Sequence, residues 1–238
     1  MYLYYIRHGD PIYDPDSLTE LGHEQAKALS KRFALLGLDE IYCSTSMRAQ
    51  MTAQPTCDIL GKEKVLLDWA NECYAWEDTF AVDENGNACW AFANDGWRKK
   101  LNSKEVLDLG FNWHTHPFFK DTPLKGGTKR VDKCLDDFML KLGFVHNREN
   151  STYKSIKPTH ERVALFAHEG FGKLFLSCLL DIPYPLFSTR FELGHSSVTV
   201  IYFESSGKEI YPRVLQWSND SHLYKEGIST KYQNHHDI

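Results

Sequence analysis

The chain has 238 residues, of which 42% are hydrophobic and 25% are charged, and its formal net charge is −5. These values are typical of an ordinary globular protein, and the negative charge disfavours a general nucleic-acid-binding surface. The six cysteines are widely spaced and include no C-x-x-C pair, which disfavours a zinc site or a small disulfide scaffold.

The first predicted strand, Tyr2 to Ile6, leads directly into the tetrapeptide Arg7-His8-Gly9-Asp10. A strand that ends in a Gly-containing turn exposes its last side chains at the carboxyl edge of a sheet, where open α/β folds bind ligands. Arg holds phosphate oxygens with a planar guanidinium, and a neutral imidazole can attack phosphorus. This turn is therefore a candidate phosphate site.

The next segments alternate between helix and strand, as expected of an α/β fold. Thr19 is a good N-cap for a helix that ends at Gly37, and Ser46 is expected to cap the following helix. Pro55 is expected to kink or break that second helix early. The elements predicted here are a helix from 19 to 37, a strand from 39 to 44, a helix from 46 to 59 and a strand from 65 to 68.

The middle of the chain, from about 73 to 125, does not show this alternation of helix and strand. It is rich in Trp, Asn, Gly, Asp and Lys and has weak periodicity. Because a structureless loop of this length is unusual inside a compact domain, we predict an insertion with its own helices, for instance Cys89 to Asn102. This insertion is expected to pack as a cap over the core.

Regular periodicity returns after Gly126-Gly127-Thr128. Apolar residues lie on one helical face from Val131 to Leu142, and the run Arg162 to Ala167 is typical of a central strand buried on both faces. That strand ends in His168-Glu169-Gly170. The remaining predictions are a polar connector from 148 to 159, a helix from 171 to 180, strands at 197–203 and 213–217, and a loosely held polar tail from 218 that contains His235-His236-Asp237.

Three strand ends thus carry matching chemistry. If the strands are parallel neighbours, their carboxyl ends meet at one edge of the sheet. Two arginines and two histidines at one edge would form a preorganised cradle for a phosphoryl group. The four residues are Arg7, His8, Arg48 and His168.

Four sequence motifs occur in this order: Arg7-His8-Gly9; Leu18-Thr19-x-x-Gly22-x-x-Gln25-Ala26; Ser44-x-x-x-Arg48-Ala49-x-x-Thr52-Ala53; and Ala167-His168. Together they resemble the histidine phosphatase superfamily, in the branch of the cofactor-dependent phosphoglycerate mutase-like proteins. The resemblance covers roughly residues 1–60 and 125–205. It implies a single domain over 1–238, built as a three-layer α/β/α sandwich with a mainly parallel central sheet and a helical or loop cap at about 73–125.

The resemblance also implies roles for the cradle residues. His8 is expected to be the nucleophile that becomes transiently phosphorylated. Arg7, Arg48 and His168 are expected to hold phosphate oxygens, and no metal or cofactor is implied because the positive side chains take the place of a metal. Thr19 either adds a hydroxyl to the substrate site or serves only as the helix N-cap.

The proton donor in the resembled family is an acid that follows the third strand. Glu72 is the preferred candidate here, and Glu77 is its rival because the spacing departs from the family pattern. A carboxyl that acts as an acid near neutral pH needs burial or a nearby anion to raise its pKa.

Glu169 is a departure from the family, in which Gly is common at this position. A carboxylate beside a phosphate cradle repels the substrate if it points inward. Three roles remain open: Glu169 contacts a non-phosphate part of the substrate, orients His168 or Arg48, or turns outward to solvent.

The function implied is metal-independent hydrolysis of a small phosphomonoester through a phosphohistidine at His8. A phosphoglycerate mutase-type phosphotransferase is the alternative; it needs extra cations, and the insertion lacks a dense set of Arg and Lys beside the motifs. A catalytically inactive phosphate-binding module is less favoured, since all the proposed core residues are present. The expected partner is a small phosphorylated metabolite or phosphate, with neither nucleic acid nor membrane. No secretory signal or bilayer-spanning stretch is evident, so we expect a cytoplasmic location.

Overall fold

The computed structural model describes residues 1–230, so that the predicted solvated segment His235-His236-Asp237 lies outside the described residues. Its centre is a six-stranded sheet in the order β12-β11-β1-β10-β4-β5. The four strands from β1 to β5 in this order are parallel, β11 is antiparallel to β1, and β12 is antiparallel to β11. The strands are β1 (Tyr2–Arg7), β4 (Glu40–Ser44), β5 (Lys64–Leu67), β10 (Arg162–Ala167), β11 (Val198–Tyr202) and β12 (Arg213–Asn219).

The central strands are buried on both faces of the sheet. In β10 the alternating residues Leu165 and Phe166 belong to two different hydrophobic clusters, and Tyr5 and Ile6 of β1 divide in the same way. This division follows from the two-residue period of a strand, which sends successive side chains to opposite faces. The predicted α/β architecture with a mainly parallel sheet is therefore confirmed.

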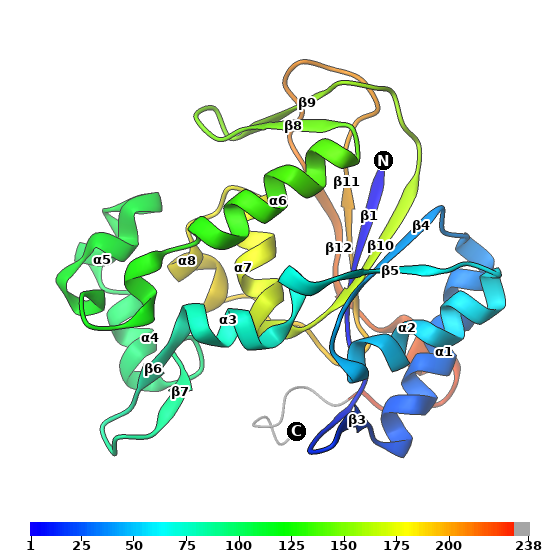
Figure 1. The fold of residues 1–238 in the computed structure, drawn as a ribbon, viewed down its shortest axis with the longest axis horizontal. Coiled ribbons are helices and arrows are strands. Elements are labelled where there is room, and N and C mark those ends of the chain that lie inside the picture. The colour runs from blue at the N-terminus through cyan, green and yellow to red at the C-terminus, as the bar shows by residue number, and fades with distance from the viewer. Residues whose placement is uncertain (231–238) are drawn as a thin grey trace.

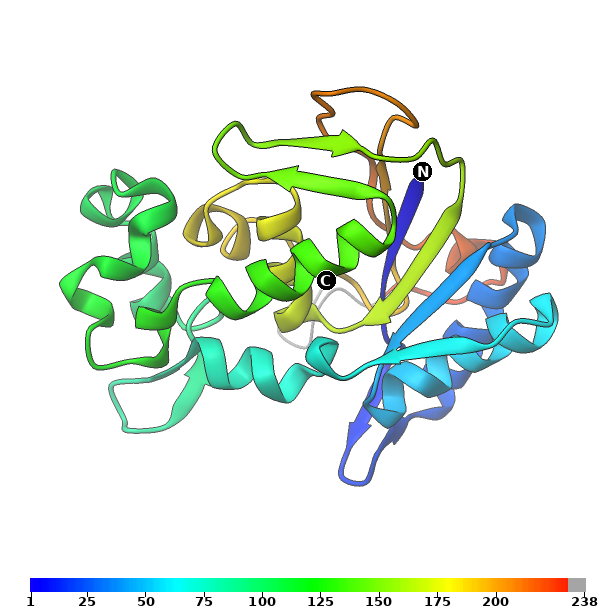
Figure 2. The same cartoon turned by 45° about the horizontal axis from the view of Figure 1, so that its top comes forward.

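Helices cover both faces of the sheet (Figure 2). One face is covered by α1 (Glu20–Leu36) and α2 (Met47–Leu60), and the other by α6 (Lys129–Lys141) and α7 (Glu169–Leu179). The hydroxyl of Thr19 caps α1 by accepting a hydrogen bond from the Gly22 N–H at 3.1 Å. Pro55 lies inside α2 without ending it, because the buried face of that helix packs against the sheet.

The segment between β5 and α6 extends away from α1 and α2 toward the opposite end of the molecule (Figure 1). The predicted helix from Cys89 to Asn102 is wrong: Cys89 lies in a strand, and the helix begins only after Asn94, whose side chain accepts a hydrogen bond from the Trp97 N–H. The elements here are η1 (Asp68–Ala70), α3 (Glu72–Thr79), β6 (Phe80–Val82), β7 (Ala88–Trp90), α4 (Asp95–Leu101), α5 (Lys104–Leu107), η2 (Gly110–Thr115), η3 (Pro117–Phe119) and η4 (Pro123–Gly126).

Two further predictions are corrected by tertiary contacts. The polar connector from 148 to 159 contains part of a hairpin in which Tyr153 is buried and stacks on His146 with ring centroids 4.1 Å apart. The tail from 218 is not loosely held throughout, because Leu223 is buried in a short helix that packs on α1. The remaining elements are β2 (Pro11–Tyr13), β3 (Asp16–Leu18), β8 (Phe144–Asn147), β9 (Thr152–Ser155), α8 (Tyr184–Ser188) and α9 (Ser221–Lys225).

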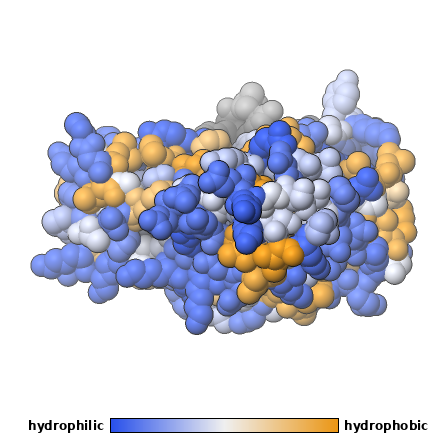
Figure 3. Space-filling view, turned by 90° about the horizontal axis from the view of Figure 1, so that it is seen from above, coloured by the Kyte–Doolittle hydropathy of each residue, from blue (hydrophilic) through white to orange (hydrophobic). Residues whose placement is uncertain are grey.

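Seen from above, one face is mostly hydrophilic and is interrupted by apolar patches (Figure 3). Within residues 1–230, none of the helices combines the length and the apolar character needed to cross a bilayer.

Candidate active site

A pocket of about 490 Å³ opens at the carboxyl ends of β1 and β4 and at the start of α7. The parallel register pairs Arg7 with Ala167 and so brings the residues after β1 and β10 together. The pocket lies where open α/β sheets bind ligands. It is lined by Arg7, His8, Tyr13, Arg48, Asn71, Glu72, Cys73, Trp76, Trp90, Phe92, Glu169 and Gly170.

His8 is held in the form that a nucleophile needs. Its Nδ1 lies 2.7 Å from the carbonyl oxygen of Gly9 and donates to it, which leaves Nε2 with its lone pair. Burial, followed by the charges of His168, Arg7 and Arg48, holds the pKa of His8 well below its usual range. The imidazole is therefore neutral near neutral pH and can attack phosphorus.

Two motif residues on helices fix the loop that carries His8. The Gly9 N–H donates to the Thr52 hydroxyl at 2.9 Å, and the Asp10 N–H donates to the Gln25 side-chain oxygen at 2.8 Å. The loop also lies directly on α1, since a Cβ at Gly22 would stand 2.2 Å from the Asp10 carbonyl oxygen. The helix motifs thus position the candidate nucleophile.

Arg7 is anchored from several sides. Its Nη1 lies 2.8 Å from a carboxylate oxygen of Glu169, and its Nη2 donates to His195 Nε2 at 2.8 Å. His195 Nδ1 in turn lies 3.4 Å from a carboxylate oxygen of Asp10. This chain of contacts fixes the direction of the guanidinium before any ligand binds.

Arg48 is anchored by different residues. Its Nη1 donates to Asp16 Oδ1 at 2.8 Å, and its guanidinium carbon lies 5.4 Å from the ring centre of Tyr13. Asp16 and Tyr13 belong to the small β2–β3 hairpin. Sequence reasoning missed both, since neither stands in one of the quoted motifs.

His168 lies beside His8, with ring centroids 5.2 Å apart. Its Nε2 is 2.8 Å from the Ser44 hydroxyl and 3.3 Å from the Ser46 hydroxyl. Burial, together with the charges of Arg48 and Arg7, lowers the pKa of His168 well below its usual range. The structure thus brings all four predicted cradle residues together.

The cradle contains unsatisfied polar atoms. Among residues 1–230, the buried Nε atoms of Arg7 and Arg48 and the Nδ1 of His168 have no hydrogen-bond partner. Buried polar atoms in folded proteins are nearly always paired, so three such atoms around one pocket call for a ligand with several acceptor oxygens.

Glu72 and Glu77 occupy different environments. Glu72 lines the pocket, and its two carboxylate oxygens accept hydrogen bonds from the N–H groups of Gly170 and Phe171, each at 2.9 Å. Burial raises the pKa of Glu72 despite these two opposing hydrogen bonds. Glu77 is exposed and does not line the pocket.

Thr19 and Glu169, the other two predicted site residues, differ in whether they line the pocket. Thr19 donates to a carboxylate oxygen of Asp10 at 2.7 Å and is not among the residues that line the pocket. Glu169 is buried and does not turn outward, and its carboxylate pairs with Arg7.

Glu169 also belongs to a cluster that sequence reasoning missed. Lys173 is fully buried, and its Nζ lies 3.4 Å from Glu169 Oε1 and 3.2 Å from Glu192 Oε1. Burial and the neighbouring Glu169 raise the pKa of Glu192 to about 7. The spacing of four residues between Glu169 and Lys173 on one helix is the signal that could have revealed this pair.

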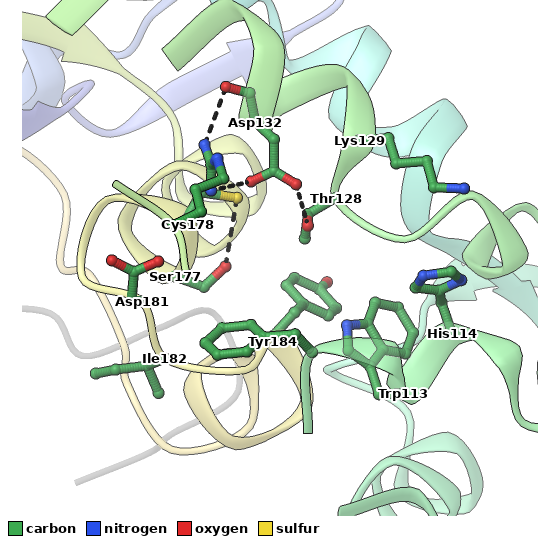
Figure 4. Close-up of a pocket in the computed structure, with 12 residues that line it drawn as sticks. Trp113, His114, Thr128, Lys129, Asp132, Ser177, Cys178, Asp181, Ile182 and Tyr184 are labelled. Carbon is green, nitrogen blue, oxygen red and sulfur yellow. Dashed lines mark hydrogen bonds and ion pairs between the residues drawn. The ribbon is translucent and has the colours of Figure 1, made fainter. Parts of the chain in front are cut away.

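A second pocket of about 290 Å³ lies between α6, α7, α8 and the η2 turn (Figure 4). Three of its charged side chains pair within the protein: Arg148 Nη1 lies 2.7 Å from Asp132 Oδ1, and Asp181 Oδ2 lies 2.8 Å from His146 Nε2. It contains none of the predicted site residues. The larger pocket is therefore the candidate active site.

The residues described include no group of three or more His, Cys, Asp or Glu side chains that could hold a metal ion. All six cysteines lie within the described residues and are unpaired thiols.

Comparisons with known proteins agree with this geometry. The model of the histidine phosphatase superfamily (branch 1) matches residues 3–100. None of the curated proteins matches the sequence significantly.

Several solved structures share the fold over nearly the whole chain. Phosphoserine phosphatase from Entamoeba histolytica is 19% identical with a TM-score of 0.60, and the alignment covers 93% of this chain and 98% of that one. The alpha-ribazole phosphatase from Shigella flexneri is 17% identical with a TM-score of 0.57, covering 92% and 97%. A mycobacterial glucosyl-3-phosphoglycerate phosphatase is 17% identical with a TM-score of 0.51, covering 91% and 98%.

At these identities the solved structures show a shared fold, and the family model adds a match over residues 3–100, somewhat less than half of the chain. That match includes Arg7, His8 and Arg48, and the fold places the buried His168 ring 5.2 Å from the His8 ring. Residues 3–100 of the chain are therefore similar to the histidine phosphatase superfamily, branch 1.

Proposed function

We propose that this protein hydrolyses small phosphomonoesters through a phosphohistidine at His8, without a metal ion. The match of residues 3–100 to the histidine phosphatase superfamily supports an enzyme of the phosphatase class. The solved structures of similar fold are described as phosphatases of phosphoserine, glucosyl-3-phosphoglycerate and alpha-ribazole compounds, which supports a small phosphorylated substrate.

In the first step, His8 Nε2 attacks phosphorus, a P–N bond forms and the P–O bond to the alcohol breaks. Arg7, Arg48 and His168 hold the phosphoryl oxygens as charge shifts onto them. Glu72 gives its proton to the departing alcohol oxygen. In the second step water attacks phosphorus, gives its proton to Glu72, and the P–N bond breaks to release phosphate and neutral His8.

The observation that best supports this proposal is the set of unpaired nitrogen atoms around His8. The Nε atoms of Arg7 and Arg48 and the Nδ1 of His168 are buried without partners among residues 1–230. A phosphoryl group supplies acceptor oxygens to all three. We assign supporting roles to Glu169, which fixes Arg7, and to Thr19, which holds Asp10 at the start of α1.

Hydrolysis is favoured over a mutase reaction by the charges in the pocket. A mutase must hold a second phosphate while the first is transferred. Among the described lining residues the basic side chains are Arg7 and Arg48, and both belong to the first phosphate site.

A turnover panel tests the proposal. Purified protein in EDTA should release inorganic phosphate and alcohol in equal amounts from at least one phosphomonoester, and the His8→Ala variant should release neither. Conversion of 3-phosphoglycerate to its isomer without net phosphate release would establish the mutase instead. Absence of turnover across sugar phosphates, nucleotides, phosphoamino acids and p-nitrophenyl phosphate would favour a binding module.

A further inference from the structure

We infer that the pocket selects phosphomonoesters whose alcohol carries a flat apolar group, such as an aromatic ring, and no second anionic group. This inference rests on the proposed function, because it concerns the part of the substrate that leaves with the alcohol oxygen. The part of the pocket lining that concerns it is aromatic.

This part of the lining is made of three adjoining aromatic rings, Trp76, Trp90 and Phe92, which we call the aromatic wall. The Trp76 and Trp90 rings are 4.9 Å apart and nearly perpendicular, and the Trp90 and Phe92 rings are 5.2 Å apart. All three are partly exposed and line the pocket, whereas Trp97 and Trp113 of the same chain segment are buried. The aromatic wall therefore presents apolar surface to whatever enters the pocket.

The aromatic wall adjoins the proposed proton donor. A Cβ placed on Gly170 would stand 2.5 Å from a ring carbon of Trp90 and 2.8 Å from Glu72 Oε1, so the ring edge and the carboxylate lie next to the same point. The leaving oxygen must come within hydrogen-bond reach of Glu72 to receive its proton. The group attached to that oxygen is consequently placed beside Trp90.

Within residues 1–230 the pocket offers a second anion no further cation. Among the described lining residues the Lys and Arg side chains are Arg7 and Arg48. The Nζ of the buried Lys173, 4.3 Å from the centre of the Phe92 ring, already pairs with Glu169 and Glu192. Arg7 and Arg48 already pair with Glu169 and Asp16, respectively. A carboxylate or second phosphate on the alcohol would meet acidic and aromatic groups, while a neutral ring would stack.

The size of the pocket is compatible with such a substrate. Ligand pockets are commonly about 300–1,000 Å³, and a pocket of about 490 Å³ has room for a phosphoryl group together with one ring. An aromatic ring on an aromatic wall gains stacking energy in addition to the burial of its surface.

Three phosphate esters of primary alcohols provide the test: benzyl phosphate, glycerol 3-phosphate and 3-phosphoglycerate. The wild-type kcat/KM for benzyl phosphate should exceed each of the others by about tenfold or more, equivalent to about 1.4 kcal/mol. In Trp90→Ala the ratio of benzyl phosphate to glycerol 3-phosphate should fall by about tenfold. The more conservative Trp90→Leu should reduce the ratio less.

Phe118→Ala is the matched control, because Phe118 is an exposed aromatic residue of the same chain segment that does not line the pocket. It should leave the ratio unchanged. Equal or faster wild-type turnover of glycerol 3-phosphate or 3-phosphoglycerate would overturn the substrate inference alone, a result that does not depend on any variant folding. No turnover of these esters or of p-nitrophenyl phosphate would overturn the proposed function and the inference with it.

Discussion

His8 and Glu72 need opposite protonation states for the proposed transfer, a neutral imidazole and a protonated carboxyl. Burial and neighbouring positive charges lower the pKa of His8 well below 6.5, so the imidazole stays neutral to lower pH. Burial raises the pKa of Glu72 above 4.5, so the carboxyl stays protonated to higher pH. The two pKa shifts widen the pH range in which His8 is neutral and Glu72 is protonated at the same time.

This pairing predicts the pH dependence of kcat/KM. Activity should rise with pH as His8 loses its proton, at a pH well below 6.5, and fall as Glu72 loses its proton, at a pH above 4.5. The profile should therefore be bell-shaped for an ester with a poor leaving group, with its rising limb due to His8 and its falling limb due to Glu72. Glu72→Gln should remove the falling limb and lower kcat by roughly 10²–10⁴-fold, and much less with p-nitrophenyl phosphate.

Glu77→Gln is the control for this experiment, since the exposed Glu77 does not line the pocket. Its pH profile should match the wild type. If Glu77→Gln rather than Glu72→Gln removed the falling limb, the assignment of the proton donor would be wrong.

At the scale of elements, the start of α1 and the loop that carries His8 depend on each other. Gln25 and Thr52 hold that loop from two helices, and Gly22 lets the loop lie directly on α1. The close approach explains why a glycine stands in the first turn of a helix, where it otherwise lowers helix stability.

Gly22→Ala should therefore affect both stability and activity. Its Cβ would stand 2.2 Å from the Asp10 carbonyl oxygen, so the loop must move. We expect a loss of about 1–3 kcal/mol in the free energy of unfolding in urea, together with a lower kcat. Gly126→Ala is the control, because nothing lies within 4 Å of its added Cβ. Wild-type stability and kcat in Gly22→Ala would contradict this account of the loop.

The long periodic elements could be predicted from the sequence, and the short ones could not. The strand from 162 to 167 and the helix after Thr19 have strong patterns that their burial confirms. The β8–β9 hairpin and α9 are short and depend on long-range packing, as in the stacking of Tyr153 on His146 and the burial of Leu223. Such contacts have no period along the chain, so composition alone suggested loops.

At the scale of the whole molecule, the sheet divides two hydrophobic cores. Leu165 and Phe166 are fully buried neighbours on β10 that point into different cores. The fold therefore depends on both faces of one strand, whereas the edge strand β12 is largely exposed.

Substitutions on these strands should show the difference in urea unfolding experiments. Leu165→Ala should cost about 2–5 kcal/mol and Phe166→Ala about 3–5 kcal/mol, because each leaves a cavity in a packed core. Leu215→Ala on β12, where the side chain is 53% exposed, should change stability by less than about 0.5 kcal/mol. A small effect of either buried substitution would show that one face of the sheet contributes little.

The arrangement of the strands in the sheet explains which parts of the site could be predicted from the sequence. Arg7 ends β1, His8 follows it, and His168 follows the parallel neighbour β10, so sheet geometry alone brings them together. The pairing of Glu169 with Arg7 and the approach of Trp90 to Gly170 join segments distant in sequence. The first contact depends on which way the Glu169 side chain turns at the start of α7, and the second depends on how the segment between β5 and α6 folds back on α7; no local sequence pattern specifies either.

The phosphohistidine at His8 is the central claim, and trapping it is the most direct measurement. Enzyme mixed with a ³²P-labelled phosphomonoester and denatured rapidly at alkaline pH should carry an acid-labile label in a peptide that contains His8. The label should be absent in His8→Ala and retained in His23→Ala, because His23 is exposed on α1 outside the pocket. A label that persists in His8→Ala, or phosphate release by His8→Ala at the wild-type rate, would contradict the account.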